Sequence, residues 1–375
     1  MAICYDFDKT LTPIDMQAQG YIQKLGFDVP AFWKESNDVA ARNEMDQNIA
    51  YMYKMLDESA GKLLFTKDTL AEYGAKVEFY PGVESWFERI RRFGEEHGVI
   101  VEHYVISSGL KEMIEGTSVA KSGAFEKIYA SSFYFNDKGV AVWPAQAVNY
   151  TNKTQFLFRI SKGILDINDQ GVNDYFSSEE LRVPFRNMVY IGDSDTDIPC
   201  MKLVNSYGGF SIGVFDAHTQ DKTKVYRMIR DNRIKYFAPA DYTEDSKMDE
   251  LIKAIIIRTA DNEALEEYSY RCKAEAIANA KEIDDEKRAK LESIIDLENS
   301  RSFTNTHMLI KRMRAYSDWT REEIEQMLGI ALANSQVRFI LADADVAEFY
   351  RSLLEKADGS TRFADEVKSL LDGNG

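Results

Sequence analysis

The sequence predicts an α/β protein built on an open, mostly parallel sheet, with an inserted helical cap and an all-helical C-terminal region. Short apolar runs that suit buried parallel strands recur up to about residue 240, with helix-period stretches between several of them. One long helical stretch interrupts this alternation early in the chain. All seven prolines and 17 of the 21 glycines lie at or before Pro239, so the last 136 residues contain little that ends a helix.

The expected strands are short apolar runs separated by helical patterns. Such alternation forms βαβ units and therefore an open parallel sheet, whose ligand site lies beyond the carboxyl ends of the strands. We therefore expect a Rossmann-like core formed by residues 1–13 and 81–245. The runs are Ala2 to Phe7, Ile100 to Ile106, Met188 to Ile191, Ser211 to Phe215 and Ile234 to Ala238.

Residues 14–80 are expected to form a helical cap inserted after the first strand. This stretch is far longer than a crossover needs, and Met, Tyr and Leu recur at helical spacing around Ile49 to Leu64. Later in the chain, residues 131–143 alternate and turn at residues 136–139, which predicts a β-hairpin before a helix that starts near Asn152.

Residues 246–375 are expected to form an acidic, helical accessory domain. Three helix-period stretches come first, at residues 246–258, 263–297 and 302–316. Thr320 and Glu323 then make a capping box before another helix, and Asp345 opens a run that stops at Gly359. The role of this domain stays open between a simple accessory, a dimerisation surface that would give a homo-oligomer, and a lid over the cleft.

The overall charge is strongly acidic. There are 62 acidic and 46 basic side chains, a net charge of −16, and the isoelectric point is near 4.9. Phosphate backbones are bound by clustered Lys and Arg, so we expect no nucleic-acid partner. A small charged substrate fits this composition if a metal offsets the acid. No apolar run approaches the roughly 18 residues of a membrane span, so no membrane partner is expected either.

The expected compartment is the cytoplasm. The first chemical motif begins at Asp6, which leaves no space before it for a signal peptide. Cys4, Cys200 and Cys272 are an odd number of cysteines at wide spacing. We therefore expect free thiols in a reducing compartment rather than a disulfide framework or a zinc site.

The first chemical motif is Asp6-Phe7-Asp8-Lys9-Thr10-Leu11-Thr12, directly after the first strand. It places two carboxylates two residues apart at the carboxyl end of a strand, where a ligand crevice is expected. One carboxylate can act as a nucleophile and the other as a general acid and base on the same ligand. Asp6 and Asp8 are therefore candidate catalytic residues.

The second motif is the acidic run Gly192-Asp193-Ser194-Asp195-Thr196-Asp197, after the strand that ends at Ile191. Three carboxylates in five residues repel one another unless a cation lies among them. Hard oxygen ligands together with phosphate chemistry favour Mg²⁺. An EF-hand loop is the competing interpretation, but Ile198 and Val204 occupy the positions where that loop needs Gly and Glu.

These motifs resemble those of the haloacid dehalogenase-like (HAD) hydrolase superfamily, whose phosphatases open with a hydrophobic strand and an Asp-x-Asp motif. In the same order, the strand ending at Ser107 matches the second motif of the superfamily and Lys153 matches its motif III lysine, with Lys162 as the competing choice. The resemblance covers roughly residues 1–245. The position of the cap resembles that of the group with a helical, C1-type cap, which includes phosphoserine phosphatase.

The resemblance implies the role of each matched residue. Asp6 attacks phosphorus, Asp8 protonates the leaving oxygen and then activates water, and Ser107 and Lys153 stabilise the transferring phosphoryl group together with Mg²⁺.

The resemblance also implies the metal ligands. These are Asp6, the Asp8 backbone carbonyl and Asp193, while Asp197 either holds a metal-bound water or orients Lys153. Asp195 fills a variable position and is expected to be a bystander.

The expected function is Mg²⁺-dependent hydrolysis of a small phosphorylated metabolite, a phosphoric monoester, through an aspartyl phosphate. Two alternatives stay open: a regulatory or protein-binding protein with weak hydrolysis, and a phosphotransferase that uses the same intermediate. The substrate is not named by the sequence. In the cap, the side chains with the chemistry to contact it are Arg42, Lys24, Lys54, Tyr51 and Tyr53, although solvated cations and core tyrosines explain them as well. The four histidines, His97, His103, His218 and His307, fall outside every motif and are expected to be structural or on the surface.

Overall fold

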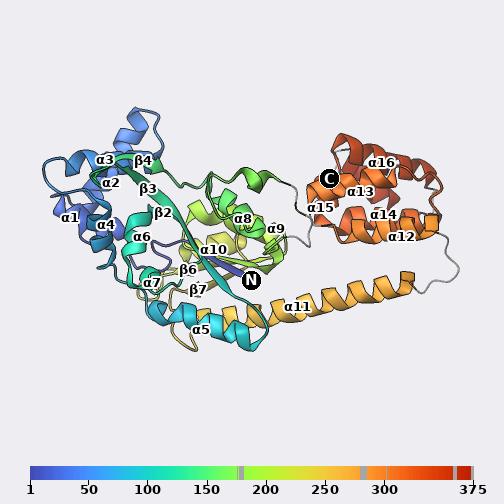
Figure 1. Ribbon diagram of the computed structural model, residues 1–375, viewed down its shortest axis with the longest axis horizontal. Coiled ribbons are helices and arrows are strands. Elements are labelled where there is room, and N and C mark those ends of the chain that lie inside the picture. The colour runs from blue at the N-terminus through green and yellow to red at the C-terminus, as the bar shows by residue number, and fades with distance from the viewer. Residues whose placement is uncertain (175, 177–180, 279–284, 301, 358–360, 373–375) are drawn as a thin grey trace. The chain divides into compact units, whose positions relative to one another are not determined.

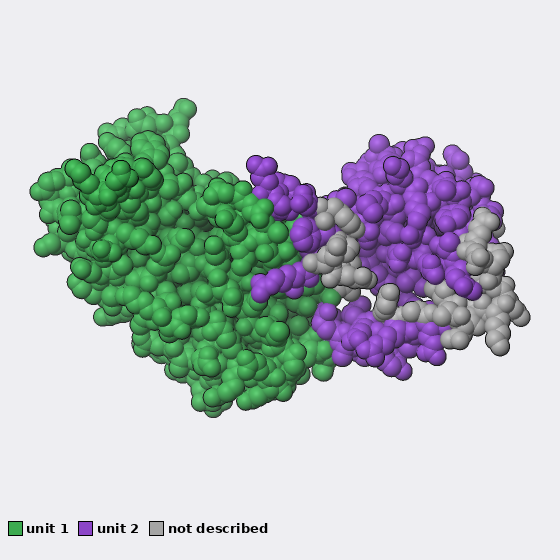
Figure 2. Space-filling view, in the orientation of Figure 1, with its two compact units in different colours: residues 1–169, 183–261 green, residues 170–182, 262–375 purple. Residues whose placement is uncertain are grey.

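The computed structural model describes the whole chain apart from residues 175, 177–180, 279–284, 301, 358–360 and 373–375. The chain divides into two compact units, shown in different colours in Figure 2. The first contains residues 1–169 and 183–261, and the second contains residues 170–182 and 262–375. Among the described residues, no helix combines the length and the apolarity needed to cross a membrane.

The first unit is built on a sheet of seven strands in the order β4-β3-β2-β1-β5-β6-β7 (Figure 1). Every neighbouring pair is parallel except β3 and β4, which confirms the predicted open, mostly parallel sheet. The strands are β1 (Ala2–Tyr5), β2 (Glu102–Leu110), β3 (Lys127–Phe135), β4 (Ala141–Gln146), β5 (Met188–Gly192), β6 (Phe210–Phe215) and β7 (Tyr236–Pro239).

Helices cover both faces of this sheet because successive side chains of a strand point to opposite faces. In β1, Ile3 and Tyr5 belong to one buried cluster, whereas Ala2 and Cys4 belong to the other. The first cluster is covered by α5 (Val83–Glu96), α6 (Lys111–Gly116) and α7 (Ser118–Lys121). The second is covered by α8 (Lys153–Lys162), α9 (Ile198–Ser206) and α10 (Thr223–Arg230). Short 3₁₀ turns, η3 (Phe185–Asn187) and η4 (Asp195–Asp197), flank β5.

The inserted segment is helical, as predicted. It contains η1 (Met16–Ala18), α1 (Tyr21–Lys24), α2 (Val29–Arg42), α3 (Gln47–Ser59) and α4 (Lys67–Gly74). The three longer helices begin with the polar side chains that satisfy free amides at a helix start, which are Asp28, Asp46 and Thr66.

The predicted hairpin joins the sheet to the cap. Its turn forms where expected, because the Asn136 amide donates to the Val140 carbonyl and Gly139 has a φ of +72°. Its first strand is longer than the sequence indicated, since β3 starts at Lys127 and pairs with β2 before it meets β4. At the far end, the Ala141 amide donates to the Phe65 carbonyl of the cap over 2.8 Å.

The long helix α11 (Lys247–Ala278) takes part in the core of the first unit. The sequence predicts that residues 246–261 belong to the C-terminal region, whereas the first compact unit extends to Asp261. The reason is packing: Met248, Ile252 and Ile256 are fully buried in the same cluster as Ile3 and Tyr5 of β1. The segment is helical, as its sequence pattern predicts. That pattern does not indicate which hydrophobic core the helix packs against.

The second unit has its own apolar core and is helical, as predicted. The capping box forms, with the Thr320 amide donating to the Glu323 carboxylate at 2.8 Å and the Glu323 amide donating to Thr320 Oγ1 at 3.3 Å. The expected stop at Gly359 lies outside the described residues. The helices are α12 (Asp285–Glu298), α13 (Phe303–Met313), α14 (Arg321–Ala333), α15 (Ser335–Phe339), α16 (Ala344–Lys356) and α17 (Ala364–Leu371), besides the 3₁₀ turn η2 (Gln170–Asn173).

Two neighbouring isoleucines of α11 test its place in the first core. Ile256 is fully buried and Ile257 is 40% exposed. We expect Ile256→Ala to lower the free energy of unfolding by about 2–5 kcal/mol and Ile257→Ala by less than about 1 kcal/mol. Urea unfolding of the full chain, followed by circular dichroism, measures both values. Equal, small losses would mean that this part of α11 does not belong to the core.

Candidate active site

Asp6 and Asp8 lie where β1 ends and the chain turns over the sheet. The Asp6 amide donates to the Ile191 carbonyl of β5 at 2.9 Å, which continues the strand pairing to this residue. Two residues later, Asp8 Oδ1 accepts a hydrogen bond of 2.7 Å from the Met16 amide at the start of the cap. The two carboxylates therefore both reach the carboxyl edge of the sheet, as the motif predicted.

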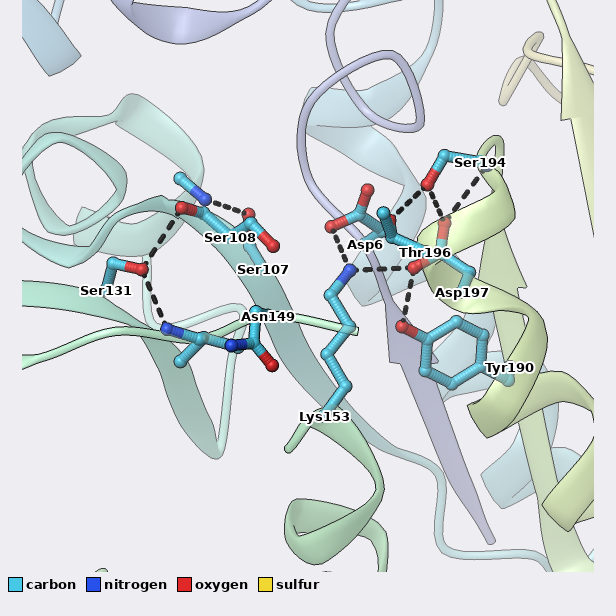
Figure 3. A network of polar contacts seen from close by, with 12 residues as sticks. Asp6, Ser107, Ser108, Ser131, Asn149, Lys153, Tyr190, Ser194, Thr196 and Asp197 are labelled. Carbon is cyan, nitrogen blue, oxygen red and sulfur yellow. Dashed lines mark hydrogen bonds and ion pairs between the residues drawn. The ribbon is translucent and has the colours of Figure 1, made fainter. Parts of the chain in front are cut away.

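Lys153 connects the two acidic motifs. It is the first residue of α8 and is fully buried, and its Nζ lies 3.0 Å from Asp6 Oδ1 and 2.7 Å from Asp197 Oδ1 (Figure 3). Burial lowers the pKa of this ammonium, but the charges of Asp197 and Asp6 outweigh burial and leave the pKa well above its ordinary value. Lys162, the competing choice, is the last residue of the same helix. Of the two lysines, the structure brings Lys153 to Asp6.

Both carboxylate oxygens of Asp197 accept hydrogen bonds from protein donors. Its Oδ1 accepts from Lys153 and from the Tyr190 hydroxyl at 2.9 Å, and its Oδ2 accepts from the Ser194 amide at 3.1 Å and hydroxyl at 2.9 Å. This arrangement fits the expected alternative in which Asp197 orients Lys153. Tyr190 and Ser194 are not predicted by the sequence motifs, although Tyr190 lies on the strand that leads to the acidic run.

The glycine that precedes the second motif leaves room for this carboxylate. A Cβ at Gly192 would lie 2.6 Å from Asp197 Oδ2 and 2.7 Å from its Cγ. Since Asp197 is fixed by four donors, it has no freedom to move aside. Glycine is therefore required at position 192 by the close approach of the Asp197 carboxylate, and not by a backbone conformation with positive φ.

The carboxylates suit a hard divalent cation. Asp6, Asp193 and Asp197 each present an oxygen, and these oxygens all lie within 4.8 Å of one another. Burial and then the charge of Asp197 raise the pKa of Asp6 to about 7, although Lys153 opposes the shift, and the same two causes raise the pKa of Asp193 to about 6. A cation would favour the ionised forms of both. Mg²⁺ accepts one or two carboxylates, and Asp6 and Asp193 are suited to provide them because Asp197 is engaged.

The acidic groups face a cavity of about 590 Å³ between the sheet edge and the cap. Ser107 of β2 is buried at its wall, and its Oγ accepts a hydrogen bond of 3.0 Å from the Gly109 amide, which leaves the hydroxyl proton free to point elsewhere. The residues that line it include Asp6, Asp8, Ser107 and Asp193 from the core, and Gln17, Trp33, Asp46, Asn48 and Tyr51 from the cap.

Other candidates lie away from this centre. Asp195 is exposed and forms an ion pair with Arg227. Both of its carboxylate oxygens accept hydrogen bonds of 2.8 Å from Arg227 Nη2. In the cap, Tyr51 lines the cavity, whereas Lys54 is paired with Glu35 and Glu58. The cavity lining does not include Arg42, Lys24 or Tyr53.

The histidines also lie outside the cavity lining. His103 is buried against Tyr5, whose hydroxyl lies 3.0 Å from its Nδ1, and burial lowers its pKa to about 3. His307, in the second unit, lies beside Asp343 and Asp345. His97 and His218 belong to surface turns.

The choice between the two lysines predicts a difference in stability. Lys153→Met leaves Asp6 and Asp197 buried without their counter-charge, so we expect a loss of about 3–5 kcal/mol in the free energy of unfolding. Lys162→Met, at the other end of α8, is expected to cost less than about 1 kcal/mol. Chemical unfolding of the two variants beside the unmodified chain makes the comparison. A Lys153→Met chain as stable as the Lys162→Met chain would contradict the buried ion pair.

Comparison with known proteins gives matches of three kinds. The sequence model of the haloacid dehalogenase-like hydrolase family matches residues 3–202. An uncharacterized protein of Borreliella burgdorferi is 26% identical over 271 residues, which is 66% of this chain and 93% of that protein. Among solved structures, a HAD family hydrolase from Salmonella enterica serovar Typhi aligns with a TM-score of 0.45 and 15% identity, covering 68% of this chain and 70% of that one.

A phosphoserine phosphohydrolase-like protein from Francisella tularensis aligns with a TM-score of 0.39 and 19% identity, covering 63% of this chain and 94% of that one. The family match spans more than half of the sequence and includes Asp6, Asp8, Ser107, Lys153, Asp193 and Asp197. The resemblance seen in the motifs is therefore confirmed: this chain belongs to the haloacid dehalogenase-like hydrolase family.

Proposed function

We propose that this protein is a Mg²⁺-dependent phosphatase that hydrolyses a small phosphoric monoester through a phosphoryl group carried on Asp6. The observation that supports it most directly is the contact of the buried Lys153 ammonium with both Asp6 and Asp197, at one wall of a cavity large enough for a metabolite. A fixed positive charge beside a carboxylate at the carboxyl edge of the sheet suits the transfer of a phosphoryl group.

In the first step, a carboxylate oxygen of Asp6 attacks phosphorus in line with the leaving oxygen. The new bond joins Asp6 to phosphorus as the bond to the leaving oxygen breaks, and Asp8 gives its proton to that oxygen. Asp8 is suited to hold a proton, because burial and then the charges of Asp15 and Asp6 raise its pKa well above its ordinary value. Asp8 is fixed for this role by the Met16 amide.

In the second step, water attacks the phosphorus and Asp8 takes its proton, so that phosphate leaves and Asp6 is restored. Lys153 and the Ser107 hydroxyl stabilise the negative charge on the phosphoryl oxygens in both steps. Mg²⁺, held by Asp6, the Asp8 backbone carbonyl and Asp193, would supply further positive charge to the same oxygens. Asp197 and Tyr190 keep the Lys153 ammonium in place.

Hydrolysis of an aryl phosphate with and without Mg²⁺ tests this proposal. We expect turnover that EDTA abolishes and Mg²⁺ restores. Asp6→Asn is expected to lower kcat at least about a thousandfold, because it removes the nucleophile. Asp195→Asn is the matched control, since Asp195 pairs with Arg227 on the surface, and it should retain the activity. Full hydrolysis by Asp6→Asn would refute the assigned nucleophile, and a rate unaffected by EDTA would refute the metal.

A further inference from the structure

We propose that the start of α3, in the cap, positions the two core residues that stabilise the phosphoryl group. Asp46, Asn48 and Tyr51 each contact one of two core segments, which carry Lys153 and Ser107. This inference rests on the proposed phosphatase function and adds positioning residues to it. The three cap side chains act on Lys153 and Ser107 through the segments that they hold.

Asn149 fixes the start of α8, the helix whose first residue is Lys153. Its carbonyl accepts from the Lys153 amide at 3.0 Å, and its Oδ1 accepts from the amides of Thr151 at 2.9 Å and Asn152 at 3.2 Å. In the other direction, Asn152 Oδ1 accepts from the Asn149 amide at 2.8 Å. Asn149 and the first turn of α8 are therefore one hydrogen-bonded unit, and a displacement of Asn149 displaces the Lys153 backbone.

The cap holds this turn through Asp46. Its Oδ1 accepts from the amides of Asn48 at 2.8 Å and Ile49 at 3.1 Å, which caps α3. Its Oδ2 accepts from Asn149 Nδ2 at 2.7 Å, a bond that the capping of α3 does not require. A second bond joins neighbouring residues, because Asn48 Nδ2 donates to the Val148 carbonyl at 2.9 Å. The first turn of α3 thus binds two adjacent residues of the segment that leads to Lys153.

The same helix also contacts the segment that carries Ser107. The Tyr51 hydroxyl donates to the Ser108 carbonyl at 2.7 Å, and the Ser131 hydroxyl of β3 donates to the same carbonyl at 3.1 Å (Figure 3). Ser131 Oγ in turn accepts from the Val148 amide at 3.0 Å. Hydrogen bonds therefore connect the two core segments through Ser131, and the cap contacts both ends of this connection.

The place of these contacts suggests which kinetic constant they affect. Tyr51, Ser131 and Val148 are buried, while Asp46 and Asn149 are half-buried at the cavity wall. Positioned charges and donors act most strongly on the transition state of phosphoryl transfer, so a small displacement of the groups that supply them slows the chemical step. Loosening the contacts from the cap is therefore expected to lower kcat more than it raises KM.

An exchange of Asp46 and Asn149 that conserves the net charge tests this role. Asp46→Asn keeps a capping oxygen but turns an amide toward Asn149 Nδ2, and Asn149→Asp brings two carboxylates together. Each single variant is expected to lower kcat for an aryl phosphate about tenfold or more, with KM changed by less than about threefold. The double variant Asp46→Asn/Asn149→Asp restores a donor opposite an acceptor, and we expect its kcat to lie within about threefold of that of the unmodified chain.

Asp28→Asn is the matched control, because Asp28 caps α2, is exposed and lies outside the cavity lining. It should retain kcat. Single variants with an unchanged kcat, or losses that multiply in the double variant, would overturn the inference. A change in KM without a change in kcat would overturn it as well, since it would mean that these side chains bind the substrate directly.

Hydrogen exchange of backbone amides, measured by mass spectrometry, separates this inference from the proposed function. We expect the peptide that contains residues 148–153 to exchange about threefold faster or more in each single variant, and at the original rate in the double variant. An unmodified chain that hydrolyses no ester, the aryl phosphate included, would refute the phosphatase function and with it the role in phosphoryl transfer. Exchange that is the same in all three variants would refute the positioning by the cap, whatever the activity.

Discussion

The buried ion pairs of Lys153 with Asp6 and Asp197 are the interaction on which the site depends. Two carboxylates and an ammonium removed from water are stable only when each charge meets a partner at close range. This condition brings together the end of β1, the start of α8 and the turn after β5, which are far apart in the sequence. The Tyr190 hydroxyl and Ser194 fix Asp197 in turn. The geometry of these side chains is therefore set by the same contacts that close the core at this edge.

The cap completes the site from the other side. It begins directly after the first motif, and its Met16 amide donates a hydrogen bond to Asp8. The hairpin of β3 and β4 fixes it again at Phe65. The sheet edge contributes Asp6, Asp8 and Ser107 to the cavity lining, and the cap contributes Asp46, Asn48 and Tyr51.

The sequence predicts the parts of this arrangement that local patterns encode. Apolar runs followed by acidic motifs locate Asp6, Asp8 and Asp193 at strand ends, because parallel strands end at one edge of a sheet. The family resemblance adds Lys153, but the choice over Lys162 depends on which end of α8 faces that edge, and this is a property of the packing. The contribution of α11 to the first core is equally a tertiary feature. The helical period shows that these residues are helical, and it does not show what they touch.

The most direct test of the central claim is to find where the phosphoryl group is carried during turnover. The protein is mixed with an aryl phosphate and Mg²⁺, quenched in acid within a single turnover, digested and analysed by mass spectrometry. The account predicts a phosphoryl group on Asp6, in the peptide that contains the first motif, and none on that residue when Mg²⁺ is withheld. A phosphoryl group on Asp8, or hydrolysis with no phosphorylated peptide at any quench time, would contradict it.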